Sequence, residues 1–283
     1  MLGRYGRAGH RVLDMLDRVW SEIRIYQPDI LKTFGRWVRG RPTIKMGRSG
    51  NGQLYVSDGR RLLAIVNERR AIKYKRGIEE RIGKLMADYH VAEAHLSPGE
   101  LVVNFGANIG ELAIGLLAKG CRVVAIEPDP AALTCLNLNC PGEVEIVPTG
   151  VWNEDGDLTF YQKPASADTS AILSHGLRDA PTLTIPAIRL DTLLADRGRI
   201  RLLVGDAEGG EPEVLEGAAG ILPQIDYVSI ACGPERNGER TIKQCCAILR
   251  GNGFQILHES DYLFARNDQV KDVTRTPREQ RAR

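Results

Sequence analysis

Hydrophobic runs of strand length alternate with segments of helical periodicity from residue 100 onward. Strands are predicted at 100–105, 121–126, 143–147, 200–206 and 225–231, and helices at 109–119, 130–139, 211–220 and 239–250. Strands that are apolar throughout and interleaved with helices indicate a parallel sheet covered on both faces. The last two strands, 253–257 and 261–265, are separated by three residues, and so short a connection joins antiparallel neighbours. The pattern predicts an α/β domain over residues 96–266, whose mainly parallel, seven-stranded sheet ends in an antiparallel hairpin.

The first 95 residues follow different patterns. Residues 11–26 place apolar side chains on one helical face, with arginines largely outside it. Such a helix would pack on its own protein or on the partner in a homodimer, or lie as a basic amphipathic helix on a membrane surface. Short β-like runs between 42 and 66 are separated by turn signals and predict a β-meander, and residues 75–90 have helical spacing. We interpret residues 1–95 as an appendage that serves as a substrate lid or a dimer contact.

Two other segments interrupt or end the main pattern. Residues 148–190 contain strand-like pieces at 157–162 and 182–188 around a polar loop. His175 in this loop could act as a general base, although a lone loop histidine is more often simply solvated. The tail, residues 267–283, is polar, charged and free of aromatic residues, which predicts disorder.

Composition and charge narrow the function classes. The net charge of +2 is too small to indicate a polyanionic partner, and no basic face rich in aromatic residues argues for nucleic acid. The six cysteines show no paired metal-binding spacing, and several lie in apolar runs, which suits a reducing compartment rather than a zinc site. The N-terminus lacks the apolar core of a signal peptide, and polar residues interrupt the longest apolar stretch, 101–126. We therefore predict a cytoplasmic protein with no transmembrane segment.

A glycine-containing loop, Asn104–Gly110, connects the first strand of the domain to the helix that follows. Glycines let the backbone turn sharply and approach a ligand, and the helix N-terminus offers unpaired N–H groups. Glu127 ends the next strand, where a carboxylate can accept both hydroxyls of a ribose. The two features together predict a nucleotide-like cofactor.

The loop favours S-adenosylmethionine over a dinucleotide. A pyrophosphate is typically bound by a tight Gly-x-Gly-x-x-Gly turn at a helix N-terminus. Here the spacing is Gly-x-x-x-Gly, and Glu111 at the helix start would repel a phosphate. S-adenosylmethionine has no phosphate, and its methionine end carries an ammonium beside a sulfonium.

Four ordered motifs extend this interpretation beyond one loop: Val103–Gly110, Ile126–Pro128, Leu190–Leu194 and Val204–Ala218. In these motifs the chain resembles the FkbM family of methyltransferases. The resemblance implies the class I methyltransferase fold with a Rossmann-like sheet. It also implies methyl transfer from S-adenosylmethionine to a hydroxyl of a small-molecule or carbohydrate acceptor such as a sugar, glycolipid or secondary metabolite.

The resemblance also assigns roles by position. It implies that the loop residues Asn104, Gly106, Ala107, Asn108 and Gly110 hold the methionine portion, that Glu127 holds the ribose, and that Pro128 is a further cofactor-binding residue. Trp152 or Asn153 would contact the adenine, although Trp152 suits core packing equally well. Asp206 and Glu208 end the fourth strand at the ligand-binding edge of the sheet. We predict Asp206, with Glu208, as catalytic residues that orient or deprotonate the acceptor hydroxyl; alternatively, they bind the cofactor's ammonium or cap backbone groups.

Three positions depart from the family pattern and motivate a competing hypothesis. Asn104 replaces an aspartate, Val204-Gly205 replaces Lys-Ile, and Ala231-Cys232-Gly233 lacks an acidic residue. The competing hypothesis is a degenerate methyltransferase fold that acts as a cofactor-binding or protein-interaction module. A nicotinamide oxidoreductase is disfavoured by Glu111 and by the closing hairpin.

A basic cluster, which comprises Arg69, Arg70, Lys73, Lys75 and Arg76, precedes the helix at 75–90 or overlaps its start. It is interpreted either as a plain solvated surface or as a site that attracts a phosphorylated or acidic acceptor.

Overall fold

The computed structural model describes residues 24–26, 44–163, 168–170, 181–236 and 238–269. Seven strands form the main sheet, in the order β14-β15-β13-β12-β5-β6-β7. Their bounds are β5 Leu101–Phe105, β6 Arg122–Ile126, β7 Glu145–Val147, β12 Ile200–Gly205, β13 Ile225–Ala231, β14 Phe254–His258 and β15 Tyr262–Asn267. Strand β15 runs antiparallel to both of its neighbours, and the other pairings are parallel. The predicted parallel sheet with an antiparallel hairpin at one end is confirmed.

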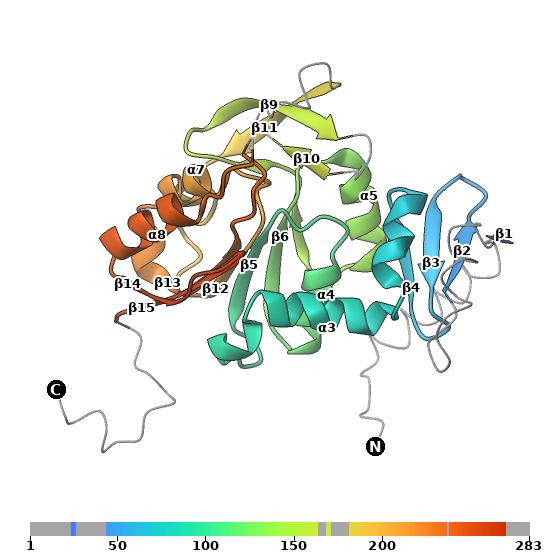
Figure 1. Ribbon diagram of the computed structural model, residues 1–283, viewed down its shortest axis with the longest axis horizontal. Coiled ribbons are helices and arrows are strands. Elements are labelled where there is room, and N and C mark those ends of the chain that lie inside the picture. Colours follow the sequence, from blue (N-terminus) through green and yellow to red (C-terminus); the bar gives the residue numbers. More distant parts are fainter. Residues whose placement is uncertain (1–23, 27–43, 164–167, 171–180, 237, 270–283) are drawn as a thin grey trace.

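Helices cover both faces of this sheet (Figure 1). They are α3 Ile78–Asp88, α4 Glu111–Ala118, α5 Pro130–Asn139, α6 Leu190–Leu193, α7 Glu211–Glu216 and α8 Ile242–Gly251. One hydrophobic core lies between the sheet and α3, α4 and α5, and a second lies between the opposite face and α6, α7 and α8. Every side chain of β5 is buried because the strand lies between these two layers.

Two glycines bring the ends of β5 and β12 close together. A Cβ atom on Gly205 would lie 2.1 Å from the carbonyl oxygen of Phe105, and one on Gly106 would lie 1.9 Å from that of Asp206. Contacts this short against backbone atoms exclude any side chain at either position. The loops that follow the two strands therefore start side by side at the carboxyl edge of the sheet, where ligands bind in folds of this kind.

The segment before the main sheet is an antiparallel meander followed by short helices. Its elements are β1 Arg24–Tyr26, β2 Lys45–Arg48, β3 Leu54–Ser57, β4 Leu62–Ile65, the 3-10 helix η1 Glu68–Tyr74, α3, and the 3-10 helix η2 Val91–Ala94. The Asn139 side chain joins β4 to α5, since its Oδ1 accepts the N–H of Ala64 and its Nδ2 donates to the Ala64 carbonyl. The meander shares its hydrophobic core with α4, α5 and one face of the sheet, so this part of the appendage is packed onto the α/β domain (Figure 1).

Two predictions about the ends of the chain need correction. The helix predicted for residues 11–26 is wrong for its last three residues, which form β1 and pair with β2, and the remainder lies outside the described residues. The tail predicted from residue 267 starts too early, because Asn267 belongs to β15 and its Nδ2 donates to the carbonyl of Ile225. Residues 270–283 lie outside the described residues.

A smaller sheet lies beside the carboxyl ends of the main strands (Figure 1). It contains β8 Gly150–Val151, β9 Gly156–Lys163, β10 Asp168–Ser170 and β11 Thr182–Ile188, in the order β10-β9-β11-β8. The two strand-like pieces predicted at 157–162 and 182–188 are thus confirmed as β9 and β11. His175 lies outside the described residues. Within the described residues, no helix has both the length and the apolar character needed to cross a membrane.

Candidate active site

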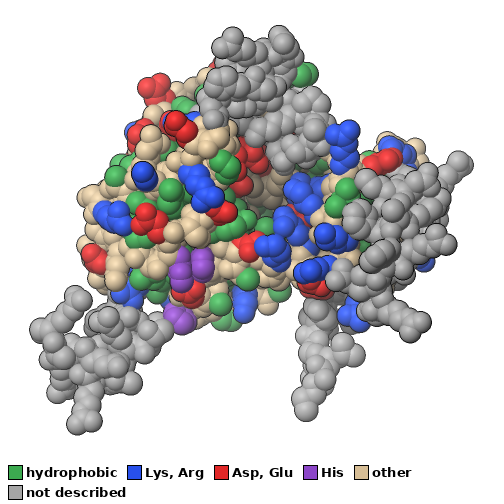
Figure 2. Space-filling view, viewed as in Figure 1, with side chains coloured by type: hydrophobic (Ala, Val, Ile, Leu, Met, Phe, Trp, Pro, Cys, Tyr) green, Lys and Arg blue, Asp and Glu red, His purple; other side chains and the backbone are tan. Residues whose placement is uncertain are grey.

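Two adjoining cavities lie at the carboxyl edge of the main sheet, and Gly106, Asn108, Asp206 and Glu208 line both of them. The first cavity extends toward the end of β6 and the smaller sheet, where Glu127, Pro128, Trp152 and Phe160 line it. The second cavity extends toward η1, α3 and the hairpin, where its wall includes Arg70, Lys73, Arg81, Asn104 and Tyr262. Figure 2 shows a hollow on this face, with Lys and Arg side chains gathered along one side of it.

The glycine loop has a backbone conformation with several positive φ angles, which glycine adopts without strain. Gly106, Asn108 and Gly110 all have positive φ angles, of 59°, 51° and 91°. A Cβ atom on Gly110 would lie 2.7 Å from the side chain of Leu136, so this glycine allows α5 to pack against the loop. Gly110 does not line either cavity and contributes to the site through packing.

Glu127 ties the glycine loop to the end of β6. Its Oε2 accepts the backbone N–H of Asn108 at 2.7 Å, and its Oε1 accepts that of Asp129 at 2.9 Å. The side chain is buried and lines the first cavity. Burial raises the pKa of Glu127 to about 7, although the two backbone N–H groups favour the ionised form. Each oxygen retains acceptor capacity, so the carboxylate can take two further donors such as the hydroxyls of a ribose.

Asn104 brings an unsatisfied acceptor to the second cavity. Its Nδ2 donates to the carbonyls of Phe105 and Val204, both at 3.3 Å. Its Oδ1 is buried and has no hydrogen-bond partner among the described residues. A buried acceptor without a partner is unfavourable unless a donor binds there. The site therefore suits a hydrogen-bond donor, such as an ammonium group, beside the glycine loop.

The loop that carries Asp206 and Glu208 is shaped by Glu211, which is only 1% exposed. Its Oε1 accepts the backbone N–H groups of Ala207 and Gly209 at 3.0 Å each, and its Oε2 accepts the Thr241 hydroxyl at 2.8 Å. Asp206 Oδ1 in turn accepts the N–H of Glu208 at 2.8 Å. Glu211 lies at the start of α7, where an acid is favoured by the helix dipole, and its hydrogen bonds also hold this loop.

Of the two residues predicted to contact the adenine, Trp152 lines the first cavity and Asn153 does not. Trp152 lines the first cavity and packs against α7, since a Cβ atom on Gly210 would lie 2.7 Å from its ring. The tryptophan is half-buried and belongs to neither hydrophobic core, and its contact with the adenine stays a prediction. Asn153 does not line the cavities, and its Nδ2 donates to Glu216 Oε2 at 2.9 Å.

Two of the three departures from the family pattern lie away from the cavities. The side chains of Val204 and Cys232 are completely buried, one in each hydrophobic core. Neither residue lines a cavity, so these substitutions remove no group from the walls. All six cysteines are free and buried, in agreement with their predicted role as small hydrophobic residues.

Glu111 is paired with two arginines rather than exposed at the helix start. Its carboxylate is buried between Arg70, at 2.5 Å, and Arg81, at 3.2 Å. Two guanidinium groups offset its charge, so the argument that Glu111 would repel a phosphate is wrong. The case against a dinucleotide then depends on the loop spacing and the antiparallel hairpin.

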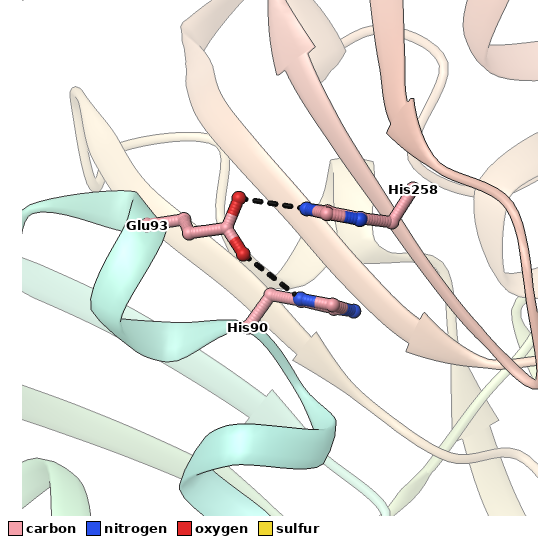
Figure 3. Close-up of side chains that lie close together, drawn as sticks. All are labelled: His90, Glu93 and His258. Atoms are coloured by element: carbon pink, nitrogen blue, oxygen red, sulfur yellow. Dashed lines mark hydrogen bonds and ion pairs between the residues drawn. The ribbon is translucent and has the colours of Figure 1, made fainter. Parts of the chain in front are cut away.

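A separate cluster joins η2 to β14 outside the two cavities (Figure 3). Glu93 hydrogen-bonds His90 Nδ1 at 3.0 Å through one oxygen and His258 Nε2 at 2.7 Å through the other. The two rings stack with their centroids 4.0 Å apart and an interplanar angle of 5°. These side chains are types that ligate transition metals, but parallel rings direct their nitrogen lone pairs side by side rather than at one point. The cluster is therefore a hydrogen-bonded clamp in this conformation.

Comparison with known proteins supports the resemblance to a methyltransferase family. A family model described as the methyltransferase FkbM domain matches residues 104–256. The 31-O-demethyl-FK506 methyltransferase FkbM of Streptomyces tacrolimicus is 28% identical over 208 residues, which cover 60% of this chain and 78% of that protein. The hexuronic acid methyltransferase AglP of Haloferax volcanii is 28% identical over 159 residues, which cover 53% of this chain and 64% of that protein.

Among solved structures, the magnesium protoporphyrin IX methyltransferase of Synechocystis with bound S-adenosylmethionine is similar to this chain. Its sequence identity is 14%, the match covers 72% of this chain and 84% of that one, and the TM-score is 0.41.

Proposed function

The chain belongs to the FkbM family of methyltransferases and uses S-adenosylmethionine as methyl donor, and on this premise we propose that it methylates a hydroxyl oxygen of a sugar, glycolipid or secondary metabolite. The observation that carries the proposal is the position of Asp206, which lines both cavities where they meet. One cavity then takes the adenosine, and the other takes the methionine end and the acceptor.

The residues of the two cavities fit the parts of S-adenosylmethionine. Glu127 accepts the ribose hydroxyls, and Pro128, Trp152 and Phe160 enclose the adenine in the first cavity. The unsatisfied Oδ1 of Asn104 accepts a hydrogen bond from the ammonium group. When bound, S-adenosylmethionine supplies a methyl group that the adjacent sulfonium makes electrophilic.

Asp206 orients the acceptor hydroxyl and takes its proton. An alcohol is a poor nucleophile until its proton is removed, and a positioned carboxylate can perform that transfer. The backbone hydrogen bond from Glu208 fixes one oxygen of Asp206, and the buried Glu211 holds the loop underneath. Alignment of the acceptor oxygen with the methyl group supplies much of the remaining acceleration.

The competing binding-module hypothesis has less support. It was based on Asn104, Val204 and Cys232, but the last two lie in the hydrophobic cores. Asn104 keeps an acceptor in the second cavity. Loss of a charge there weakens one interaction with the cofactor without removing it.

The test is methyl transfer from isotopically labelled S-adenosylmethionine to a panel of sugars, glycolipids and polyhydroxylated metabolites. We expect a product whose label is stable to mild alkali, because a methyl ether resists the hydrolysis that cleaves a methyl ester. A label released by alkali would place the methyl group on a carboxylate and contradict O-methylation of a hydroxyl. Absence of transfer to every acceptor, with S-adenosylmethionine bound, would favour the binding module.

A further inference from the structure

One wall of the second cavity is basic and comes from the segment before the main sheet. Arg70 and Lys73 belong to η1, and Arg81 belongs to α3. In the sequence, the basic cluster at 69–76 was the feature that indicated this charged wall. The structure adds Arg81 to this wall. Within the basic cluster, Arg70 and Lys73 line the cavity, whereas Arg69, Lys75 and Arg76 do not.

Arg70 is a buried cation whose hydrogen-bonding capacity is only partly used. It is 4% exposed, and its Nη2 donates to Glu111 Oε2 at 2.5 Å. Its Nε and Nη1 are buried and meet no acceptor at hydrogen-bond geometry among the described residues, although the buried Tyr74 hydroxyl interacts with the same guanidinium. Burial alone would lower the pKa of Arg70, but the Glu111 carboxylate raises it above its usual range, so the group stays charged. Unused donors on a buried guanidinium are costly unless an acceptor binds there.

The cations on this wall lie on η1 and α3, and the carboxylates Asp206 and Glu208 line the same cavity from the end of β12. Glu111 pairs with both Arg70 and Arg81. Lys73 adds a third cation to the same lining. An arginine fork matches a carboxylate in shape, and a lysine adds a point charge. The wall thus suits an anionic group that has planar acceptor geometry.

We propose that Arg70, Lys73 and Arg81 form an anion subsite that binds a carboxylate next to the methyl-transfer centre. This rests on the proposed function, because that function places the methionine end and the acceptor in this cavity. The carboxylate has two sources: the amino-acid end of S-adenosylmethionine, or an acid group on a sugar acceptor. Asn104 Oδ1 lines the same cavity, so the ammonium and carboxylate of an amino-acid end would both find partners there.

The first arm of the test measures dissociation constants for S-adenosylmethionine and its decarboxylated analogue by calorimetry. The variants are Lys73→Gln and Arg81→Gln, whose side chains are at least partly exposed and can be replaced without opening the core. If the subsite binds the methionine carboxylate, the wild type binds the analogue about 10- to 100-fold more weakly. The variants then lose affinity for S-adenosylmethionine by about tenfold and keep the affinity for the analogue.

The second arm uses the protein saturated with S-adenosylhomocysteine and compares methyl glucuronoside with methyl glucoside. If the carboxylate belongs to the acceptor, the wild type binds the glucuronoside about tenfold more tightly than the neutral sugar. The two variants lose that preference, while their affinity for S-adenosylmethionine stays at the wild-type value. Arg70→Lys keeps the positive charge but loses the bidentate guanidinium. In the arm of the test in which Lys73→Gln and Arg81→Gln change the affinity, it gives an affinity between those of the wild type and these variants.

Lys84→Gln is the matched control, because Lys84 lies on the same helix as Arg81, is exposed and does not line the cavity. Wild-type affinities for every ligand in both the Lys73 and Arg81 variants would overturn the proposal. So would an equal loss for S-adenosylmethionine and its decarboxylated analogue, since that indicates general damage to the site. Failure of the proposed function is separate: it is absence of methyl transfer to any hydroxyl, which these binding measurements do not depend on.

Discussion

Glu127 accepts the backbone N–H of Asn108 at 2.7 Å, so the end of β6 holds the glycine loop through a single buried carboxylate. The same carboxylate lines the first cavity, so its charge affects the affinity for a ligand bound there.

The pKa of Glu127, about 7, predicts a pH-dependent affinity for the cofactor. Ribose hydroxyls donate more strongly to the ionised carboxylate than to the protonated acid. Affinity for S-adenosylhomocysteine should therefore fall by about tenfold from pH 8 to pH 6, as the ionised fraction falls. Calorimetry across this range checks it. Glu127→Gln should bind more weakly at pH 8 and show no such slope; an equal slope in that variant would assign the titration to another group.

Asn104→Asp should separate stability from cofactor affinity. The amide donates to two backbone carbonyls at 3.3 Å, and a carboxylate would instead place its charge against them. We expect the free energy of unfolding of the ligand-free variant to drop by about 1–3 kcal/mol. A carboxylate would also attract the ammonium, so affinity for S-adenosylmethionine should rise by about tenfold. Urea unfolding and calorimetry measure the two effects, and a variant that binds more weakly would place the ammonium elsewhere.

Asp206→Asn distinguishes the catalytic role of this residue from cofactor binding. Loss of a general base typically lowers the rate by about 10²–10⁴-fold. We expect kcat to fall by that factor while the dissociation constant for S-adenosylmethionine stays within about threefold. Single-turnover kinetics with saturating cofactor provide the measurement. A large loss of cofactor affinity with little change in the chemical step would instead assign Asp206 to the ammonium.

The glycine loop and Glu127 could be identified from the sequence because both depend on local order: a strand, a turn, a helix, and the end of the next strand. The basic wall could not, because Arg70 and Arg81 meet only where η1 and α3 pack on α4. Similarly, His258 is 165 residues from Glu93, and no local pattern connects the two. Glu211 was missed because an acid at a helix start already has a simple explanation in the helix dipole.

The clamp of His90, Glu93 and His258 should make a small, pH-dependent contribution to stability. Burial opposes ionisation, but hydrogen bonds from both histidines together outweigh it and lower the pKa of Glu93 below its usual value of 4.5. The stabilisation is therefore present above about pH 4.5 and is lost as the pH falls through the lowered pKa. The carboxylate is largely solvated, so Glu93→Gln should cost no more than about 1 kcal/mol at pH 7.

Urea unfolding at pH 7 and pH 3 checks this, with the exposed Glu143→Gln as control. The difference between Glu93→Gln and the wild type should shrink at pH 3. A difference that persists there would mean that the glutamate acts through packing rather than charge.

Gly205→Ala tests the close approach of β5 and β12. A Cβ atom there would lie 2.1 Å from the Phe105 carbonyl oxygen, and both Gly205 and Phe105 are buried in neighbouring parallel strands. The backbone must shift to relieve the contact, which would move the loops that carry Gly106 and Asp206. We expect a loss of at least about 3 kcal/mol of stability, measured by urea unfolding.

The matched control is Gly83→Ala in α3, where nothing lies within 4 Å of the added Cβ atom. Alanine is favoured over glycine within a helix, so this variant should gain about 0.5–1 kcal/mol. If Gly205→Ala folds with wild-type stability and binds S-adenosylhomocysteine normally, the two strand ends are not held as closely as this geometry requires. If it folds but binds weakly, the spacing of the strands matters mainly for the cofactor.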